Sequence, residues 1–213
     1  MAYKLLLFDF DGTLVDTVGD IAFYVNEVLA GEGQSGHSVE RVKEAIGWGV
    51  HELFKELAPE FSSDTERLER AVEAFKRCYR EKPVLKSRPF EGVQEILEGD
   101  LSKAVKGIVT NKPQDITLQI LDELGLRKHF KSVIGMHAGF PAKPDPAALL
   151  HLMNLLGFSA KETIYIGDSP IDGETSTAAG VDFAWMSYGY HALDGAKPVY
   201  RFSSAKEWGV LVK

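Results

Sequence analysis

The sequence has little cysteine, no excess of positive charge and no long hydrophobic run. Cys78 is the single cysteine, so no disulfide can form within the chain, which fits a reducing compartment. The formal net charge of −7 argues against a dedicated nucleic-acid-binding protein. No stretch approaches the length of a membrane span, and the N-terminal apolar stretch is too short for a signal peptide. We therefore expect a cytoplasmic protein with neither a nucleic-acid nor a membrane partner.

Sequence repeats and low-complexity tracts are also absent. The six histidines show no metal-ligand spacing. What remains is an ordinary composition for a globular protein, with 45% hydrophobic and 26% charged residues. A chain of 213 residues can form one large domain, or a main domain with an insert.

The most informative stretch lies near the N-terminus. Leu5 to Phe8 is apolar at every position, which predicts a strand covered on both faces, as in the centre of a parallel sheet. Asp9 and Asp11 follow directly, and Gly12 lets backbone amides approach a ligand closely. In open α/β sheets, ligands bind beyond the carboxyl ends of the strands, so this pair of carboxylates is a candidate site.

Residues 17–83, here called the helical insert, have no strand-like run and carry apolar residues at helical spacing. We expect about four helices, the last starting from a capping box of Ser63 and Glu66. Residues 83–92 contain two prolines and a closing glycine and are expected to be a linker. The predicted domains are therefore a core of residues 1–16 and 84–213 and a helical cap of residues 17–83.

After the linker, predicted strands and helices alternate. Strands are expected at residues 105–110, 132–135, 163–167 and 181–186, with helices at 113–124, 146–157 and 169–180. Such alternation predicts an α/β fold, a doubly wound parallel sheet with a Rossmann-like core. The helical insert would lie outside this core.

Polar residues follow four of these strands: Asp9 and Asp11; Thr110 and Asn111; Lys143; and Asp168 and Asp172. In a doubly wound sheet these ends share one edge, so the side chains can meet in one crevice. Up to four neighbouring carboxylates cannot all stay ionised without compensation, and Mg²⁺ suits carboxylate oxygens. With a lysine and a hydroxyl beside it, such a pocket suits phosphoryl transfer.

In such a pocket the carboxylates can divide the chemistry. One can attack phosphorus and form an aspartyl-phosphate. A second can protonate the leaving alcohol and then deprotonate the hydrolytic water. The others can hold the metal ion or orient its waters.

At these residues the sequence resembles the haloacid dehalogenase-like hydrolase superfamily. Its first motif, Asp-x-Asp-Gly-Thr, matches Asp9 to Thr13, and its second, a strand-end Thr or Ser, matches Thr110. Its third, a Lys before Pro, matches Lys143, and its fourth matches Gly167 to Ser169 with Asp172. The four motifs span the chain in the family's order, and the helical insert stands where the family has its small cap.

The resemblance implies a role for each matching residue. Asp9 would be the nucleophile and Asp11 the general acid/base. Mg²⁺ would be held by Asp9, the backbone carbonyl of Asp11 and Asp168, with Asp172 in direct or indirect contact. The remaining set, which would bind the phosphoryl group, comprises Thr110, Lys143, Asn111 and Gly12. An aspartate at position 11 goes with the phosphatase branch of the superfamily.

Within the superfamily, the chain is most similar to the phosphoglycolate phosphatase group, in Leu14 to Thr17, Arg88 to Gly92 and Thr110 to Lys112. This similarity implies a small phosphorylated metabolite as substrate, with a phosphoglycolate-like one favoured. A β-phosphoglucomutase-like phosphomutase and an inorganic pyrophosphatase are alternatives. A non-catalytic phospho-receiver or binding module is a remote alternative. Whether the protein is a monomer or a homodimer stays open.

Several candidates also have a purely structural interpretation. Asp172 could be a helix-capping carboxylate, and Asp16 could simply start a helix. Residues 47–49, Gly-Trp-Gly, could form a cap loop near the substrate, or Trp48 could belong to the core of the insert. Basic residues of the insert could be solvated, or one or two could meet a substrate carboxylate. They are Arg41, Lys43, Arg67, Arg70, Lys76 and Arg77.

Overall fold

A computed structural model describes residues 2–213 and contains a six-stranded sheet with the order β5-β4-β1-β6-β7-β8. Every neighbouring pair of strands in it is parallel. The strands are β1 (Leu5–Phe8), β4 (Val105–Pro113), β5 (Ser132–Met136), β6 (Thr163–Gly167), β7 (Asp182–Met186) and β8 (Tyr200–Phe202). The predicted doubly wound α/β fold is confirmed.

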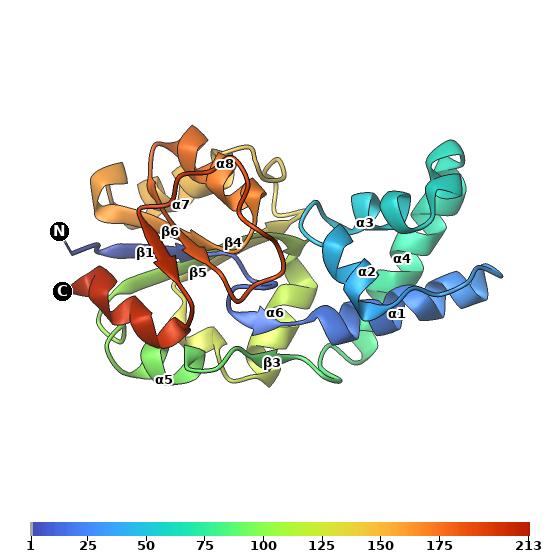
Figure 1. Cartoon of the computed structure of the whole chain (residues 1–213), viewed down its shortest axis with the longest axis horizontal. Coiled ribbons are helices and arrows are strands. Elements are labelled where there is room, and N and C mark those ends of the chain that lie inside the picture. The colour runs from blue at the N-terminus through green and yellow to red at the C-terminus, as the bar shows by residue number, and fades with distance from the viewer. Residues whose placement is uncertain (1) are drawn as a thin grey trace.

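Helices cover both faces of this sheet because the side chains of β1 alternate. Leu6 and Phe8 are buried in a cluster with α5, α6 and the C-terminal 3₁₀ helix η4, whereas Leu5 and Leu7 pack with α7 and α8. Figure 1 shows α7 and α8 above the sheet and α5 below it. The helices of this part are α5 (Val93–Glu98), α6 (Gln114–Glu123), η2 (Arg127–His129), α7 (Ala147–Leu156), η3 (Ala160–Glu162), α8 (Pro170–Ala179) and η4 (Ala205–Val212).

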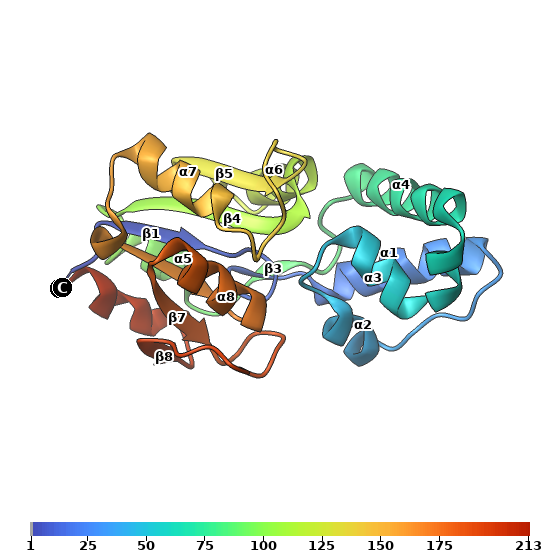
Figure 2. The ribbon, with the colours of Figure 1, turned by 90° about the horizontal axis from the view of Figure 1, so that it is seen from above.

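Four α-helices and a 3₁₀ turn lie beside the end of the sheet, as Figures 1 and 2 show. They are α1 (Val18–Gly31), α2 (Val39–Ala45), α3 (Val50–Leu57), η1 (Pro59–Ser63) and α4 (Thr65–Glu81). The predicted capping box at Ser63 is wrong by one residue. Asp64 caps α4 by accepting a hydrogen bond from the Arg67 amide at 2.9 Å, because Ser63 still belongs to the 3₁₀ turn.

The two connections between the sheet and these helices pair with each other. β2 (Val15–Asp16) and β3 (Arg88–Pro89) form a short antiparallel ribbon that the sequence did not predict. Behind it, the buried Asp20 of α1 accepts hydrogen bonds from three successive backbone amides, Leu85 to Ser87, at 2.7–3.0 Å. The start of the helical insert is thereby tied to the returning chain.

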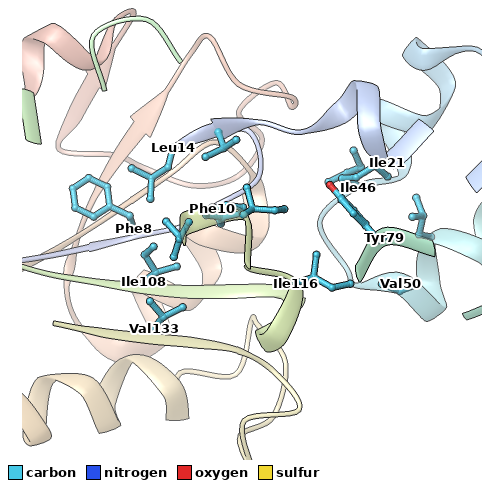
Figure 3. Close-up of a cluster of buried hydrophobic side chains, with 14 of the residues drawn as sticks. Phe8, Phe10, Leu14, Ile21, Ile46, Val50, Tyr79, Ile108, Ile116 and Val133 are labelled. Carbon is cyan, nitrogen blue, oxygen red and sulfur yellow. The ribbon is translucent and has the colours of Figure 1, made fainter. Parts of the chain in front are cut away.

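One apolar cluster runs from the sheet into the helical insert. Figure 3 shows it passing from Phe8 and Ile108 on the strands, past Phe10, to Ile21 and Tyr79 on the helices. A shared core of this kind holds the two parts together while leaving room between them at the strand ends. Among residues 2–213, no helix is both long and apolar enough to cross a bilayer.

Candidate active site

A cavity lies between the carboxyl ends of the strands and the helical insert. Asp9 follows β1, Thr110 and Asn111 belong to the end of β4, and Asp168 follows β6; all four line the cavity together with Asp11. The chain passes from β1 to β4 and β5 on one side and to β6 on the other. Asp9 therefore lies at the point where the strand order reverses, the usual ligand position in such sheets.

Lys143 joins two of the predicted carboxylates in a buried network. Its Nζ lies 3.0 Å from Asp9 Oδ1 and 2.6 Å from Asp172 Oδ1, and it donates to the Tyr165 hydroxyl at 2.9 Å. Its side chain is only 3% exposed. A buried ammonium needs such partners, since an unpaired charge in a protein interior is very costly. Lys143 therefore has one fixed position, next to Asp9.

Burial and charge together set the protonation of this network. Burial raises the pKa of Asp9 to about 6, with Asp172 adding to the rise and Lys143 and Thr110 opposing it. Burial would lower the pKa of Lys143, but the charges of Asp172 and Asp9 raise it above its ordinary value. Burial, with the nearby Asp172 and Asp9, also raises the pKa of Asp168 well above its usual range. Asp9, Asp168 and Asp172 thus carry more negative charge than Lys143 compensates.

Asp168 lies in a cradle that only glycines allow. A Cβ on Gly12 would come within 2.3 Å of Asp168 Oδ2, and one on Gly189 within 2.1 Å of Asp168 Cβ. Gly12 also has a φ of 80°, which side chains rarely tolerate. The Thr13 hydroxyl and the Tyr190 amide each donate to the carboxylate at 2.8 Å. Four neighbours therefore fix how Asp168 faces the cavity.

The arrangement fits a hard divalent cation. Asp9, Asp168 and Asp172 each present a carboxylate oxygen within 4.8 Å of the others, and all three are buried. Each carboxylate has about four lone-pair positions, and Asp168 uses one per oxygen for hydrogen bonds. Oxygen donors with uncompensated charge are what Mg²⁺ prefers. The cluster can therefore hold a metal ion.

Asp11 also lines the cavity and contacts the start of the helical insert at Thr17. The Thr17 hydroxyl donates to its Oδ1 at 2.5 Å, and Lys112 Nζ lies 3.1 Å from the same oxygen. The side chain of Asp11 is 12% exposed, so a molecule in the cavity can reach it. Its two neighbours come from opposite parts of the structure, the start of the helical insert and the end of β4.

The sequence matches the haloacid dehalogenase-like hydrolase family over residues 6–186. The chain belongs to this family. As a haloacid dehalogenase-like hydrolase it is an enzyme, and the resemblance inferred from its four motifs is confirmed. The motif residues Asp9, Asp11, Thr110 and Asp168 line the cavity, so the family match and the geometry concern the same part of the molecule.

Relatives of this hydrolase include phosphoglycolate phosphatases. That of Pseudomonas syringae pv. tomato is 36% identical over 193 residues, which cover 88% of this chain and 71% of the relative. That of Aquifex aeolicus is 31% identical, covering 94% of this chain and 92% of the relative. A crystal structure described as a predicted phosphoglycolate phosphatase from Haemophilus somnus matches with a TM-score of 0.91 at 26% identity, covering 99% and 98% of the two chains.

Two of the candidate residues of this hydrolase, Asn111 and Asp172, use their side-chain polar atoms in hydrogen bonds within the protein. The Asn111 amide donates to the carbonyls of Gly47 and Lys143 and accepts from the Lys143 amide, at 2.8–3.1 Å. It thereby positions Lys143 and the loop at Gly47. Asp172 Oδ2 accepts from Ser169, both amide and hydroxyl, in a capping box at the start of α8. The capping interpretation of Asp172 is confirmed, and its other oxygen binds Lys143.

The basic residues of the helical insert stay away from the cavity. None of the six named above lines it within residues 2–213, and four of them pair with glutamates of the insert. Gly47 and Gly49 do line the cavity, and Trp48 is 49% exposed. The interpretation of this segment as a loop near the site is confirmed, and that of Trp48 as a core residue is wrong.

Tyr190 and Lys112 are site residues that the sequence analysis did not identify. The Tyr190 hydroxyl accepts hydrogen bonds from the amides of Thr17 and Val18 at 2.7 and 3.0 Å, which caps α1 from another part of the fold. Its own amide binds Asp168. The only local signal was the Tyr188-Gly189-Tyr190 turn after β7, and nothing in that turn specifies a partner more than 170 positions away.

Proposed function

We propose that this protein is a phosphoric monoester hydrolase that acts on a small phosphorylated metabolite, with a phosphoglycolate-like substrate favoured. The observation that carries the proposal is the meeting of Asp9, Asp11, Thr110 and Asp168 around one cavity, with Lys143 bound to Asp9 beside it. The phosphoglycolate phosphatases among its relatives support the same reaction class.

In the proposed first step, a carboxylate oxygen of Asp9 attacks phosphorus. The Asp9–phosphorus bond forms while the ester bond to the leaving oxygen breaks, which converts one difficult displacement into two easier ones. Lys143 and the Thr110 hydroxyl lie beside Asp9 and would stabilise the charge on the phosphoryl oxygens. Because Lys143 is already fixed by Asp172, it needs no reorganisation during the step.

Asp11 is proposed to move the protons. It would give its proton to the leaving alcohol oxygen, and it would then take a proton from the water that attacks the aspartyl-phosphate. The second attack breaks the Asp9–phosphorus bond, releases inorganic phosphate and restores both aspartates. Thr17 and Lys112 hold Asp11 at the cavity, where it would reach both the leaving alcohol oxygen and the attacking water.

Mg²⁺ is the proposed cofactor, held by Asp9, Asp168 and the main-chain carbonyl of Asp11, with Asp172 next to them. When bound, the ion would supply positive charge against the phosphoryl oxygens. The cradle of Gly12, Thr13 and Gly189 around Asp168 supports this assignment.

The helical insert of residues 17–83 is proposed to act as a mobile cap. It forms one wall of the cavity, and only the connections at β2 and β3 lead to it. Closing would exclude water from the reacting groups, which strengthens their electrostatic interactions, and opening would release the products.

The test is Mg²⁺-dependent phosphate release from 2-phosphoglycolate by the wild-type protein and by Asp9→Asn. We expect Asp9→Asn to lose activity by roughly 10³-fold or more, since it removes the attacking oxygen. Asp122→Asn, the same change at an exposed position of α6, is the matched control and should keep full activity. Normal turnover by Asp9→Asn, or equal turnover with and without added Mg²⁺ in EDTA-treated protein, would contradict the proposal.

A further inference from the structure

The cavity has one polar wall and one apolar wall. Its core side carries the carboxylates and the end of β4, whereas its insert side carries hydrocarbon and aromatic side chains. The latter are Ile21, Ile46, Val50, Leu53, Phe75 and Tyr79. Figure 3 shows Ile21, Ile46, Val50 and Tyr79 gathered on the helical insert. A leaving group that extends from the phosphoryl site towards the insert therefore meets few polar partners.

Lys112 is the one lysine or arginine that lines this cavity within the described residues 2–213. Lys143 lies beside the cavity but is bound to Asp9 and Asp172. His191 also lines the cavity, and burial lowers its pKa, which keeps the imidazole uncharged near neutral pH. An anionic group on the leaving alcohol has Lys112 as its single cationic partner there.

The Lys112 ammonium is held at a defined position. Its Nζ lies 3.1 Å from Asp11 Oδ1, 3.3 Å from the Tyr79 hydroxyl and 4.5 Å from the centre of the Tyr79 ring. Its side chain is 3% exposed. Its two hydrogen bonds go to Asp11 Oδ2 at 3.4 Å and to the Tyr79 hydroxyl, and they use two of the three N–H donors of the ammonium. One donor is left for a ligand in the cavity, directly beside the carboxylate that is proposed to protonate the leaving oxygen.

We infer that Lys112 selects substrates that carry a second negative charge, a carboxylate, close to the ester oxygen. The inference rests on the proposed phosphatase activity and specifies its substrate class as short phosphorylated hydroxy acids. A carboxylate next to the ester carbon would lie beside Asp11, where Lys112 binds it through a charge-assisted hydrogen bond. Lys112 is then a specificity residue, distinct from Lys143 at the phosphoryl group.

The apolar wall of the cavity disfavours larger polar leaving groups. A sugar or a second phosphoryl group would place hydroxyls or charges against Ile21, Val50 and Phe75, and each polar group buried without a partner costs roughly 1–3 kcal/mol. The lining thus favours a leaving group that has few polar atoms besides one charged group.

Two substrates of the same size separate charge from shape. 2-Phosphoglycolate and 2-phosphoglycolamide differ in having a carboxylate or an uncharged carboxamide on the same carbon. We expect wild-type kcat/KM to favour 2-phosphoglycolate by about 30-fold or more, which is within the range expected for one hydrogen bond to a charged group. In Lys112→Met this preference should fall at least tenfold, mainly through a higher KM for 2-phosphoglycolate.

Two further variants control the measurement. Lys76→Met removes an equally buried lysine of α4 that pairs with Glu73 and does not line the cavity, so it should keep the wild-type preference. Lys112→Arg keeps the charge and should restore part of the preference that Lys112→Met loses. Thermal unfolding of each variant checks that the fold is intact.

The outcomes distinguish the inference from the proposed function. If wild type hydrolyses both esters equally well, or if Lys112→Met slows both by the same factor, the inference is overturned while the phosphatase activity stands. If Lys112→Met does not fold, the ratio of the kcat/KM values for the two esters in the wild type and in Lys112→Arg still tests the inference. If no ester is hydrolysed in an Asp9-dependent manner, the proposed function fails and the inference fails with it.

Discussion

Replacing Asp20 should destabilise the connection between the sheet and the helical insert. Asp20 is fully buried, and its Oδ2 accepts hydrogen bonds from the amides of Leu85 and Ser87 at 3.0 Å and from the Ser87 hydroxyl at 2.5 Å. Its Oδ1 accepts from the Lys86 amide at 2.7 Å. One side chain therefore satisfies four donors of the returning chain.

The magnitude follows from the number of donors left without an acceptor. Asp20→Ala leaves the buried amide and hydroxyl of Ser87 and the part-buried amides of Leu85 and Lys86 without an acceptor, and each buried unsatisfied donor costs about 1–3 kcal/mol. We expect the free energy of unfolding to fall by about 4 kcal/mol, which corresponds to roughly 8–16 °C in Tm for a chain of this length. Asp20→Asn keeps an acceptor at Oδ2 but turns a donor towards Lys86, so it should lose less than half as much.

Thermal and urea unfolding measure the global effect, and amide hydrogen exchange at residues 85–87 measures the local one. These amides should be protected in the wild type and exchange faster in Asp20→Ala. Glu27→Ala, at an exposed position of the same helix, is the control and should change stability by less than about 0.5 kcal/mol. A loss below about 1 kcal/mol in Asp20→Ala, with unchanged exchange at residues 85–87, would refute the reasoning.

Three further predictions concern the site and its surroundings. Tyr190→Phe removes the hydroxyl that accepts from the amide of Thr17, so it should speed hydrogen exchange at the start of α1; unchanged exchange would contradict the capping role. Gly12→Ala adds a Cβ 2.3 Å from Asp168 at a φ of 80°, and we expect at least about 3 kcal/mol of destabilisation and weaker Mg²⁺ binding by calorimetry. Burial lowers the pKa of His129, so the unfolded chain binds its proton first and stability should fall as the pH drops below about 6.5. Urea unfolding between pH 7 and 5.5 should show a smaller loss of stability in His129→Gln than in the wild type. The same dependence of stability on pH in both proteins would contradict the prediction.

Local sequence was enough to predict the family and five strands of the six-stranded sheet, all but β8, because the relevant signals are short-range. An unbroken apolar run as short as Leu5 to Phe8 favours a strand covered on both faces, and the structure places it inside the sheet. The order of the motifs along the chain predicted which strand ends would carry polar groups. Small errors arose where two local signals compete, as at Ser63 and Asp64, both of which can cap a helix.

Other features could not be predicted because their partners are distant in the sequence. The ribbon of β2 and β3 joins two segments that are only two residues long, too short for any periodicity. Lys112 was visible as a strand-end residue, but its contacts with Asp11 and Tyr79 depend on how α4 packs against the core. The role of Tyr190 likewise depends on a loop returning to the start of α1.

The sequence by itself determined the alternation of strands and helices, the four motifs and therefore the family and the reactive residue types. These follow from hydrophobic periodicity and from short motifs whose residues are close together in the sequence. Only the tertiary structure decided which charges are paired, which donors remain free and which wall of the cavity is apolar. Such properties belong to contacts between segments far apart in the chain, and burial and distance, not composition, set their energies.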